Sequence, residues 1–587
     1  MKRRTSRWLF VPLVLCLMLV LLQGATLAAD NTYVPYEGAS YALQYSEKSD
    51  GTLSITGYTG TAEGELILPE RINGKIVTEI GMNAFNGCKG FTGSLIIPDG
   101  VTKIGWYAFF GCSGFTGTLV IGNNVKSIVD LAFAYCDGFS GELYLPDTLV
   151  EIGSEAFSDC SGFTGNLVIP DSVTSLGALA FDGCSGFSGD LIIGNGIKEI
   201  SRRAFFNCSG FAGTLKIGDA VTTIGGGAFY NCSGFTGELI IPNSVQNIES
   251  TTYQNSNAVD YGAFENCTGF TGNVIIPDNV TTIGAKAFYN CSGFDGTLKI
   301  GSSVETIGAS AFGDCTGLKG NLIIPDSVKT ISSSMNYIYQ DKYYRSGASN
   351  LFGAFRNCTG FTGDLVIGTG LEGIGPGAFE NCSGFTNSLF IPDNVTEIGG
   401  SAFSGCSGFT GKLIISNSLT DIESSTFSEC SSLTSVTIPD SVTSIGSSAF
   451  SECSSLTSVT IPDSVTSIGS STFSGCSSMT SMIIPDGVKS IGSRAFSGCS
   501  SLTSVVIPNS VTSILERAFE DCSSLARVTI PVTVSIDSYA FSGCASVSYV
   551  RLTGVGEMEN FKSEPWGSNT TTINIENGVT SIRETLI

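Results

Sequence analysis

Cysteine is the residue type in this chain that is best able to do chemistry, and its spacing is regular. Of the 20 cysteines, all but Cys16 recur, mostly 24 residues apart, then 23 and finally 22 residues apart toward the end of the chain. A thiolate can act as a nucleophile or bind a metal ion, and two thiols can pair in a disulfide. The repeating positions are Cys88, Cys112, Cys136, Cys160, Cys184, Cys208, Cys232, Cys267, Cys291, Cys315, Cys358, Cys382, Cys406, Cys430, Cys453, Cys476, Cys499, Cys522 and Cys544.

The chain contains no histidine, which removes the usual base for a cysteine or serine nucleophile. No C-x-x-C pair occurs either, so the spacing typical of a zinc site is missing. The stretches outside the repeat are only about 50 residues long, too short for an ordinary catalytic domain. We therefore expect no enzyme, no catalytic residue, no metal and no cofactor.

One clear copy of the repeat covers residues 456–476 and predicts two short strands and a turn. It reads Leu-Thr-Ser-Val-Thr-Ile-Pro-Asp-Ser-Val-Thr-Ser-Ile-Gly-Ser-Ser-Thr-Phe-Ser-Gly-Cys. Val459 and Ile461 alternate as in a strand, and a second apolar pair follows the Pro-Asp turn. Phe473 and Cys476 are three residues apart, which places them on one face of a short helical turn. Such a repeat buries its apolar residues only by stacking on its neighbours.

Stacking in register predicts a buried column of cysteines beside a column of phenylalanines, with a spacing of about 4.8 Å between coils. Disulfides are the alternative, and that spacing allows isolated pairs. However, equivalent side chains point in parallel, and an odd number of cysteines leaves at least one unpaired. We expect buried free thiols that behave as small hydrophobes.

The N-terminus reads as a signal peptide over residues 1–29, with an uncleaved anchor as the alternative. Four basic residues precede an apolar run from Leu9 to Leu22, and alanines near residue 28 offer a cleavage site. Cleavage leaves 25 basic and 52 acidic residues, a net charge near −27. This charge disfavours nucleic acid as a partner. We expect a secreted or cell-surface protein with no transmembrane span once the signal is removed.

Residues 438–460, Ile-Pro-Asp-Ser-Val-Thr-Ser-Ile-Gly-Ser-Ser-Ala-Phe-Ser-Glu-Cys-Ser-Ser-Leu-Thr-Ser-Val-Thr, resemble the BspA-like class of leucine-rich repeats. The segments 51–58 and 77–85 resemble the first coil of that family. The resemblance implies a curved β-rich solenoid of about nineteen repeats of 22–24 residues, with short strands and short helical turns. It also implies a role in adhesion to proteins, cells or surfaces, without naming a ligand.

The repeat divides the chain into a cap and two blocks. Residues 30–80 are the expected N-terminal coil or cap, residues 81–545 the solenoid, and residues 546–587 a degenerate C-terminal coil or cap. Repeats through Cys406 carry Gly-Phe-Thr-Gly, as at residues 162–165, whereas later repeats carry Ser-Leu-Thr-Ser, as at residues 455–458, and are one residue shorter. The difference predicts a change of curvature near Cys430.

Two insertions interrupt the repeat at the same point, at residues 250–262 and 332–353. They are three coils apart and rich in tyrosine, a residue type that concentrates at interfaces. We expect them to form one recognition edge, although surface insertions also drift without function. The binding candidates here are Tyr253, Tyr261, Tyr337, Tyr339, Tyr343, Tyr344 and Arg345.

The central residue of each first strand is a second binding candidate, because it projects away from the core. A long exposed apolar stripe usually marks an interaction surface, whereas β-propensity alone would also favour branched residues here. Tyr144 and Phe390 are its aromatic members. The full stripe is Ile96, Val120, Tyr144, Val168, Ile192, Lys216, Ile240, Ile275, Lys299, Ile323, Val366, Phe390, Ile414, Thr437, Thr460, Ile483, Val506 and Thr529.

A column of acids and amides follows the Pro-Asp turn, at positions such as Asp171, Asn195, Asp219, Asn243 and Asp278. We expect Asx turns there, with a calcium-binding column as the alternative.

Taken together, the sequence predicts a protein that binds an extracellular protein or glycan. The alternative is a passive structural component of a cell envelope or surface layer.

Overall fold

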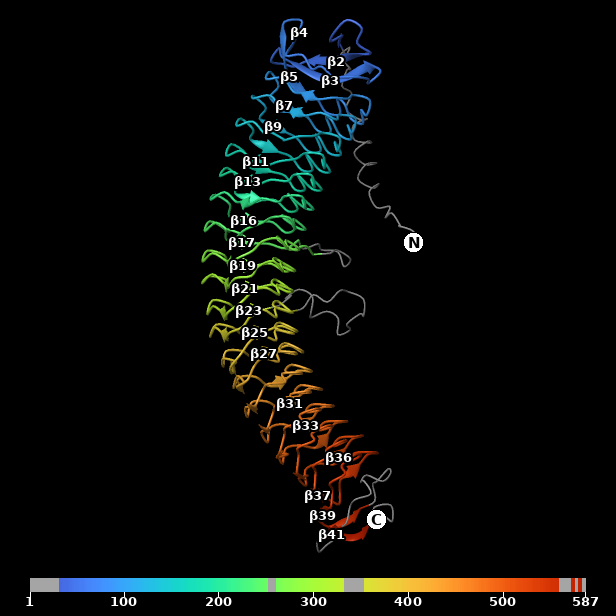
Figure 1. Ribbon diagram of the computed structural model, residues 1–587, viewed down its shortest axis with the longest axis vertical. Coiled ribbons are helices and arrows are strands. Elements are labelled where there is room, and N and C mark those ends of the chain that lie inside the picture. Colours follow the sequence, from blue (N-terminus) through green and yellow to red (C-terminus); the bar gives the residue numbers. More distant parts are fainter. Residues whose placement is uncertain (1–30, 252–259, 332–352, 559–571, 576–578, 583–587) are drawn as a thin grey trace.

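The computed structural model describes residues 31–251, 260–331, 353–558, 572–575 and 579–582. The chain forms a single curved β-solenoid, seen in Figure 1 as an arc of stacked coils from the N-terminal to the C-terminal end. The predicted fold is therefore confirmed. The signal peptide expected at residues 1–29 lies outside the described residues.

Most coils contribute a first strand that carries the Leu-x-Ile motif and pairs in parallel with the equivalent strand of a neighbouring coil, as Leu167 pairs with Leu191. The equivalent residues 143–145, 239–241 and 482–484 follow the same path without forming a strand. The alternation predicted from the sequence is present, with the central residue outward and its neighbours in the core. The first strands are β6 (Leu95–Ile96), β8 (Leu119–Val120), β11 (Leu167–Ile169), β13 (Leu191–Ile193), β15 (Leu215–Lys216), β18 (Val274–Ile275), β20 (Leu298–Lys299), β22 (Leu322–Ile324), β24 (Leu365–Ile367), β26 (Leu389–Phe390), β28 (Lys412–Ile414), β30 (Ser435–Thr437), β32 (Ser458–Thr460), β35 (Ser504–Val506), β37 (Arg527–Pro531), β39 (Tyr549–Thr553) and β41 (Thr572–Ile575).

A second, shorter strand follows the Pro-Asp turn, and its last residue is buried. These strands also pair in parallel from coil to coil. They are β5 (Lys75–Ile80), β7 (Lys103–Ile104), β9 (Ser127–Ile128), β10 (Glu151–Ile152), β12 (Ser175–Leu176), β14 (Glu199–Ile200), β16 (Thr223–Ile224), β17 (Asn247–Ile248), β19 (Thr282–Ile283), β21 (Thr306–Ile307), β23 (Thr330–Ile331), β25 (Gly373–Ile374), β27 (Glu397–Ile398), β29 (Asp421–Ile422), β31 (Ser444–Ile445), β33 (Ser467–Ile468), β34 (Ser490–Ile491), β36 (Ser513–Ile514) and β38 (Ser535–Ile536).

The third side of each coil, from the end of the second strand to the cysteine, is not the short helical turn that the sequence predicts. We call this side the turn face. Ser471 and Gly475 have φ angles of 54° and 74°, which a right-handed helical turn does not allow. The N–H of Phe473 donates instead to the carbonyl of Ala495 in the next coil. The described residues contain no helix, because this side of the coil also bonds to its neighbours.

The core consists of stacked side-chain columns. The phenylalanine three residues before each cysteine lies flat on its counterpart, with ring centroids 5.2 Å apart for Phe85 and Phe109 and 5.0 Å apart for Phe519 and Phe541. A second phenylalanine column, three residues after the cysteine, accompanies it through Phe409, with Leu318 as its one interruption. The apolar residues of both strands fill the remaining space.

The two ends of the stack differ from its middle. At the N-terminal end, Tyr58 stacks on Phe85 and Tyr41 packs edge-on against Phe91, so the two tyrosines terminate the phenylalanine columns. These tyrosines come from an antiparallel meander of β1 (Asn31–Tyr33), β2 (Tyr41–Glu47) and β3 (Leu53–Gly60), with β4 (Arg71–Ile72) pairing with β5. At the C-terminal end, β41 pairs with β39, and β42 (Val579–Ile582) pairs with β40 (Gly556–Met558), which adds one more coil.

Candidate binding surfaces

The cysteine column lies inside the solenoid. All nineteen described cysteines are buried and free. Each thiol of the regular coils donates to the carbonyl of the core phenylalanine in the preceding coil, as Cys160 does to Phe133 at 3.0 Å and Cys453 to Phe427 at 3.2 Å. The thiols thus complete the hydrogen bonding of the stack.

Burial also suppresses the chemistry of these thiols. Desolvation raises the pKa of Cys315 to about 12 and that of Cys160 well above its ordinary value. A thiol that stays protonated at neutral pH is neither a nucleophile nor a metal ligand. Within the described residues, no three Cys, Asp or Glu side chains gather as a metal site would require.

The outward residues of the first strands form the stripe that the sequence predicts to be exposed. Tyr144 is 72% exposed, Phe390 is 54% exposed and Ile483 is 79% exposed. Where the first strands pair in register, these residues lie side by side from coil to coil, as Phe390 lies beside Ile414. We call this surface the outward stripe. Lys216 and Lys299 interrupt it, and threonines replace the branched residues at several later coils.

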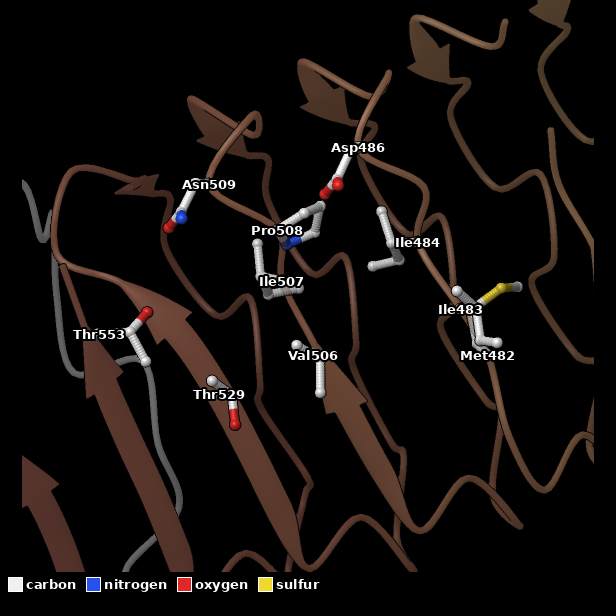
Figure 2. Close-up of a pocket in the computed structure, with 10 residues that line it drawn as sticks. All are labelled: Met482, Ile483, Ile484, Asp486, Val506, Ile507, Pro508, Asn509, Thr529 and Thr553. Atoms are coloured by element: carbon white, nitrogen blue, oxygen red, sulfur yellow. The ribbon is translucent and has the colours of Figure 1, made fainter. Parts of the chain in front are cut away.

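A shallow hollow of about 550 Å³ opens on the C-terminal part of the outward stripe. Figure 2 shows Ile483 and Val506 beside it, with Asp486 and Asn509 on its rim. The remaining lining residues are Met482, Ile484, Ile507, Pro508, Thr529 and Thr553. The arrangement offers an apolar floor with few polar groups, and no set of residues that could perform acid–base chemistry.

Tyr144 carries a polar contact as well as an exposed ring. Its hydroxyl donates to the carboxylate of Glu142, two residues earlier in the chain. This hydrogen bond, together with the carboxylate charge, raises the pKa of Tyr144. The ring is therefore held in place while its face stays open to a ligand.

The two insertions leave the solenoid from the turn face, each after a second strand, β17 and β23, and these strands are three coils apart as predicted. Of the tyrosines and the arginine proposed in them, only Tyr261 falls within the described residues. Tyr253, Tyr337, Tyr339, Tyr343, Tyr344 and Arg345 lie outside them.

Hydrogen bonds and an ion pair hold the base of the first insertion. Ser250 and Gly262 form an antiparallel bridge, and Tyr261 and Thr251 exchange two hydrogen bonds of 2.8 and 3.1 Å. A buried ion pair of 3.6 Å joins Glu265 and Lys286 just below, and Lys286 also donates to the carbonyl of Asp260.

Tyr261 belongs to a cluster that the sequence reasoning missed. Its ring packs edge-on against Tyr230 at 4.8 Å and Phe206 at 5.1 Å. The guanidinium of Arg203 lies 4.4 Å from the centre of the Tyr261 ring and 4.9 Å from that of Phe206. The signal in the sequence was an aromatic residue directly after the core phenylalanine, where most coils carry a small or polar residue.

A second aromatic group on the turn face was also missed. Trp106 packs against Tyr107, Tyr107 against Phe110, and Phe110 against Tyr135, with ring centroids between 5.1 and 5.2 Å apart. Trp106 and Tyr135 are 41% and 47% exposed.

The column of acids and amides does not form the local Asx turns that the sequence predicts. Asp171 Oδ1 accepts from the backbone N–H of Asn195 at 2.7 Å, and Asn195 Oδ1 accepts from the N–H of Asp219 at 2.9 Å. Each acceptor therefore bonds to the next coil, because in a stack the equivalent N–H lies closer than a local one. This use engages one side-chain oxygen of each of these residues, an atom that a calcium column would need.

The repeats match a known family. A family model described as BspA type leucine rich repeat region matches residues 70–187, 163–261, 257–340, 352–480 and 466–586. No curated protein matches the chain.

The chain is also similar to several solved structures, at low identity. A leucine-rich repeat protein from Bacteroides ovatus ATCC 8483 is 20% identical and covers 92% of this chain and 100% of its own, with a TM-score of 0.34. A leucine rich cell surface protein from Faecalibacterium prausnitzii A2-165 is 22% identical and covers 93% of this chain and 99% of its own, with a TM-score of 0.29. The leucine rich repeat protein of T. pallidum is 28% identical and covers 33% of this chain and 87% of its own, with a TM-score of 0.30.

Across the described residues, no helix is long and apolar enough to cross a membrane.

Proposed function

The chain belongs to the BspA-type leucine-rich repeat family, and we propose that it is a secreted or cell-surface protein that binds an extracellular protein or glycan, in the manner of an adhesin. The outward stripe carries this proposal. The fold needs apolar residues only on the inward side of each first strand, since those side chains form the core. Outward positions are free to be polar, yet Ile96, Val168, Ile323 and Ile483 keep apolar side chains in water.

An exposed apolar stripe of this length is typical of an interaction surface. Stacking of branched residues along a sheet also contributes, but it does not require the aromatic rings of Tyr144 and Phe390 or the hollow beside Ile483. The fully buried cysteines and the absence of histidine support binding over catalysis.

The insertions are the second part of the proposed binding surface. They leave the solenoid three coils apart on one edge, and the first has a rigid base in the ion pair of Glu265 and Lys286. Tyrosines in such loops offer large contact area at a low cost in side-chain entropy.

The test is a binding screen of residues 30–587 against whole cells, matrix proteins and glycans. The stripe variant carries Ile483→Glu and Val506→Glu, and its matched control carries Ser447→Glu and Ser470→Glu at exposed positions of the turn face, away from the stripe. A third variant lacks residues 252–259 and 333–352.

Loss of binding in the stripe or loop variant, with full binding by the control, supports the proposal and locates the site. Equal binding by all variants removes both surfaces as the site. No binding by any form, together with concentration-dependent assembly of the intact protein, favours the passive structural role instead.

A further inference from the structure

The turn face of the second and third cysteine-marked coils carries aromatic rings that the fold does not require. Trp106, Tyr107, Phe110 and Tyr135 form a continuous group, and we call it the aromatic patch. The last coils of the chain build the same turn with serine in place of Trp106, Tyr107 and Phe110, for example at residues 470, 471 and 474.

The backbone conformation at two of these positions does not favour aromatic residues. Tyr107 and Tyr135 have φ angles of 55° and 61°, a conformation that favours glycine or asparagine over aromatic residues. Other coils place Gly111 or Gly183 at the position of Tyr135. An aromatic residue there works against local preference, so its ring needs another reason to be present.

Acidic residues continue the patch along the next two coils. Glu155 and Asp159 follow in one coil and Asp182 in the next, all on the turn face. The backbone brings their coils together, because the N–H of Asp159 donates to the carbonyl of Asp182 at 2.6 Å. Burial and neighbouring carboxylates raise the pKa of Glu155 and Asp159, and raise that of Asp182 to about 6. Burial raises the pKa of Tyr135, and the charges of Asp159 and Glu155 raise it further.

The charge of Arg203, in the coil after Asp182, lowers the pKa of Asp182 in part, but burial and the neighbouring carboxylates outweigh it. In the described part of the chain, none of the ion pairs within 4.0 Å includes Glu155, Asp159 or Asp182. The surface therefore combines exposed ring faces with excess negative charge, and both attract the same chemical group, an organic cation.

We propose that the aromatic patch, with Glu155, Asp159 and Asp182 beside it, binds an extended, arginine- or lysine-containing segment of a partner polypeptide. A guanidinium or ammonium group would lie over Trp106 or Tyr135 while a second one meets the carboxylates. The patch and its acidic flank extend over four coils, about 15 Å at the strand spacing, which matches four to five residues of extended chain. The site lies on a different face from the outward stripe, so it stands or falls independently of it.

Other ligand classes fit this surface less well. Nucleic acid and anionic lipid are repelled by the carboxylates. A neutral glycan would use the rings but would leave the excess charge uncompensated.

The experiment uses a fluorescent ten-residue peptide of alternating arginine and serine, and a matching glutamate–serine peptide. Binding to residues 30–587 is measured by anisotropy at low salt and at about 0.5 M salt, where charge attraction is screened. One variant carries Trp106→Ser and Tyr135→Ser, and another carries Asp159→Asn and Asp182→Asn. The controls are Tyr539→Ser and Asp521→Asn, which change an exposed turn-face aromatic residue and a turn-face acid far along the solenoid.

We expect the arginine peptide to bind, the glutamate peptide not to bind, and each patch variant to lose at least tenfold in affinity while the controls keep theirs. Thermal unfolding of each variant verifies that it is folded, and the asparagine variant removes charge repulsion, so unfolding would not explain its loss. Equal binding by all variants, or binding of both peptides alike, would overturn the proposal. A glycan array signal that disappears in the serine variant but persists in the asparagine variant would reassign the patch to carbohydrate.

Discussion

The coils through Cys406 and the coils from Cys430 onward build the same solenoid with different cores. Except at Leu318, the earlier coils carry two stacked phenylalanine columns, as Phe163 stacks on Phe187 at 5.9 Å beside the column of Phe157 and Phe181. The later coils keep only the first column, and Leu456 and Met479 occupy the place of the second. One aromatic column therefore suffices to stack a coil.

The extra residue of the earlier coils changes how one backbone group is satisfied. The N–H of Thr214 donates to the side chain of Asp190 in the preceding coil at 2.6 Å. In the later coils the strand begins at that position, and Ser458 pairs directly with Ser435. The earlier coil thus uses a side chain where the later one uses the sheet itself.

The core columns give the largest expected effect. Phe163→Ala should cost about 4 kcal/mol and Leu456→Ala about 3 kcal/mol, because each opens a cavity between fixed neighbours. Phe163→Leu, which imitates the later block, should cost under about 1.5 kcal/mol. Hydrogen exchange resolved by mass spectrometry would locate the loss in the altered coil and its neighbours. An equal cost for the alanine and leucine substitutions would show that the ring does not determine the stacking.

The side-chain acceptor of the earlier coils should have a smaller effect. Asp190→Ala leaves the N–H of Thr214 without its partner and should cost under about 1 kcal/mol, since the site is exposed. Ser458→Ala should be neutral, because the sheet supplies the bond.

The effect of Asp190 should depend on pH. Its hydrogen bonds with Thr214 hold the pKa of Asp190 below the ordinary value of 3.8, so its contribution is present above about pH 4 and is lost as the pH falls below that. Thermal unfolding at pH 7 and pH 3 measures this. A cost that persists at pH 3 would contradict the account.

Removing the charge of a turn-face acid should change the stability at pH 7 in opposite directions in the two blocks. Burial raises the pKa of Asp182 to about 6, so the folded state holds its proton more tightly and loses stability as the pH rises from about 4 to 6. Asp182→Asn should therefore raise the unfolding temperature at pH 7 and leave it unchanged below pH 4. Glu520 forms an ion pair with Arg517 at 3.2 Å, so Glu520→Gln should lower the free energy of unfolding by about 0.5 kcal/mol. Destabilisation at pH 7 by both changes would contradict this reading.

The sequence predicted the parts of the fold that depend on periodicity. The alternation of apolar residues at Val459 and Ile461 correctly predicted the inward and outward faces of the first strand. It could not distinguish a helical turn from the observed turn at Phe473 and Cys476, because both place residues three apart on one side. The acceptor role of Asp171 was missed because its partner lies one coil away, where a local pattern does not reach.

The candidate sites were predicted less completely. The exposure of Tyr144 and Phe390 followed from strand alternation. The grouping of Trp106 with Tyr135 did not, because the two lie 29 residues apart in sequence and only the stacking of turn faces brings their coils together. The change of curvature near Cys430 stays a prediction.

Counting reactive thiols tests the central claim, a column of buried free cysteines inside one continuous stack. The mature protein is treated with a thiol reagent before and after denaturation, without reductant, and the labels are located by mass spectrometry. The account predicts almost no labelling of the native protein and labelling of all nineteen cysteines once it is unfolded. Rapid native labelling at several positions in the middle of the stack, or cysteines that stay unlabelled in the unfolded protein because they are paired, would contradict it.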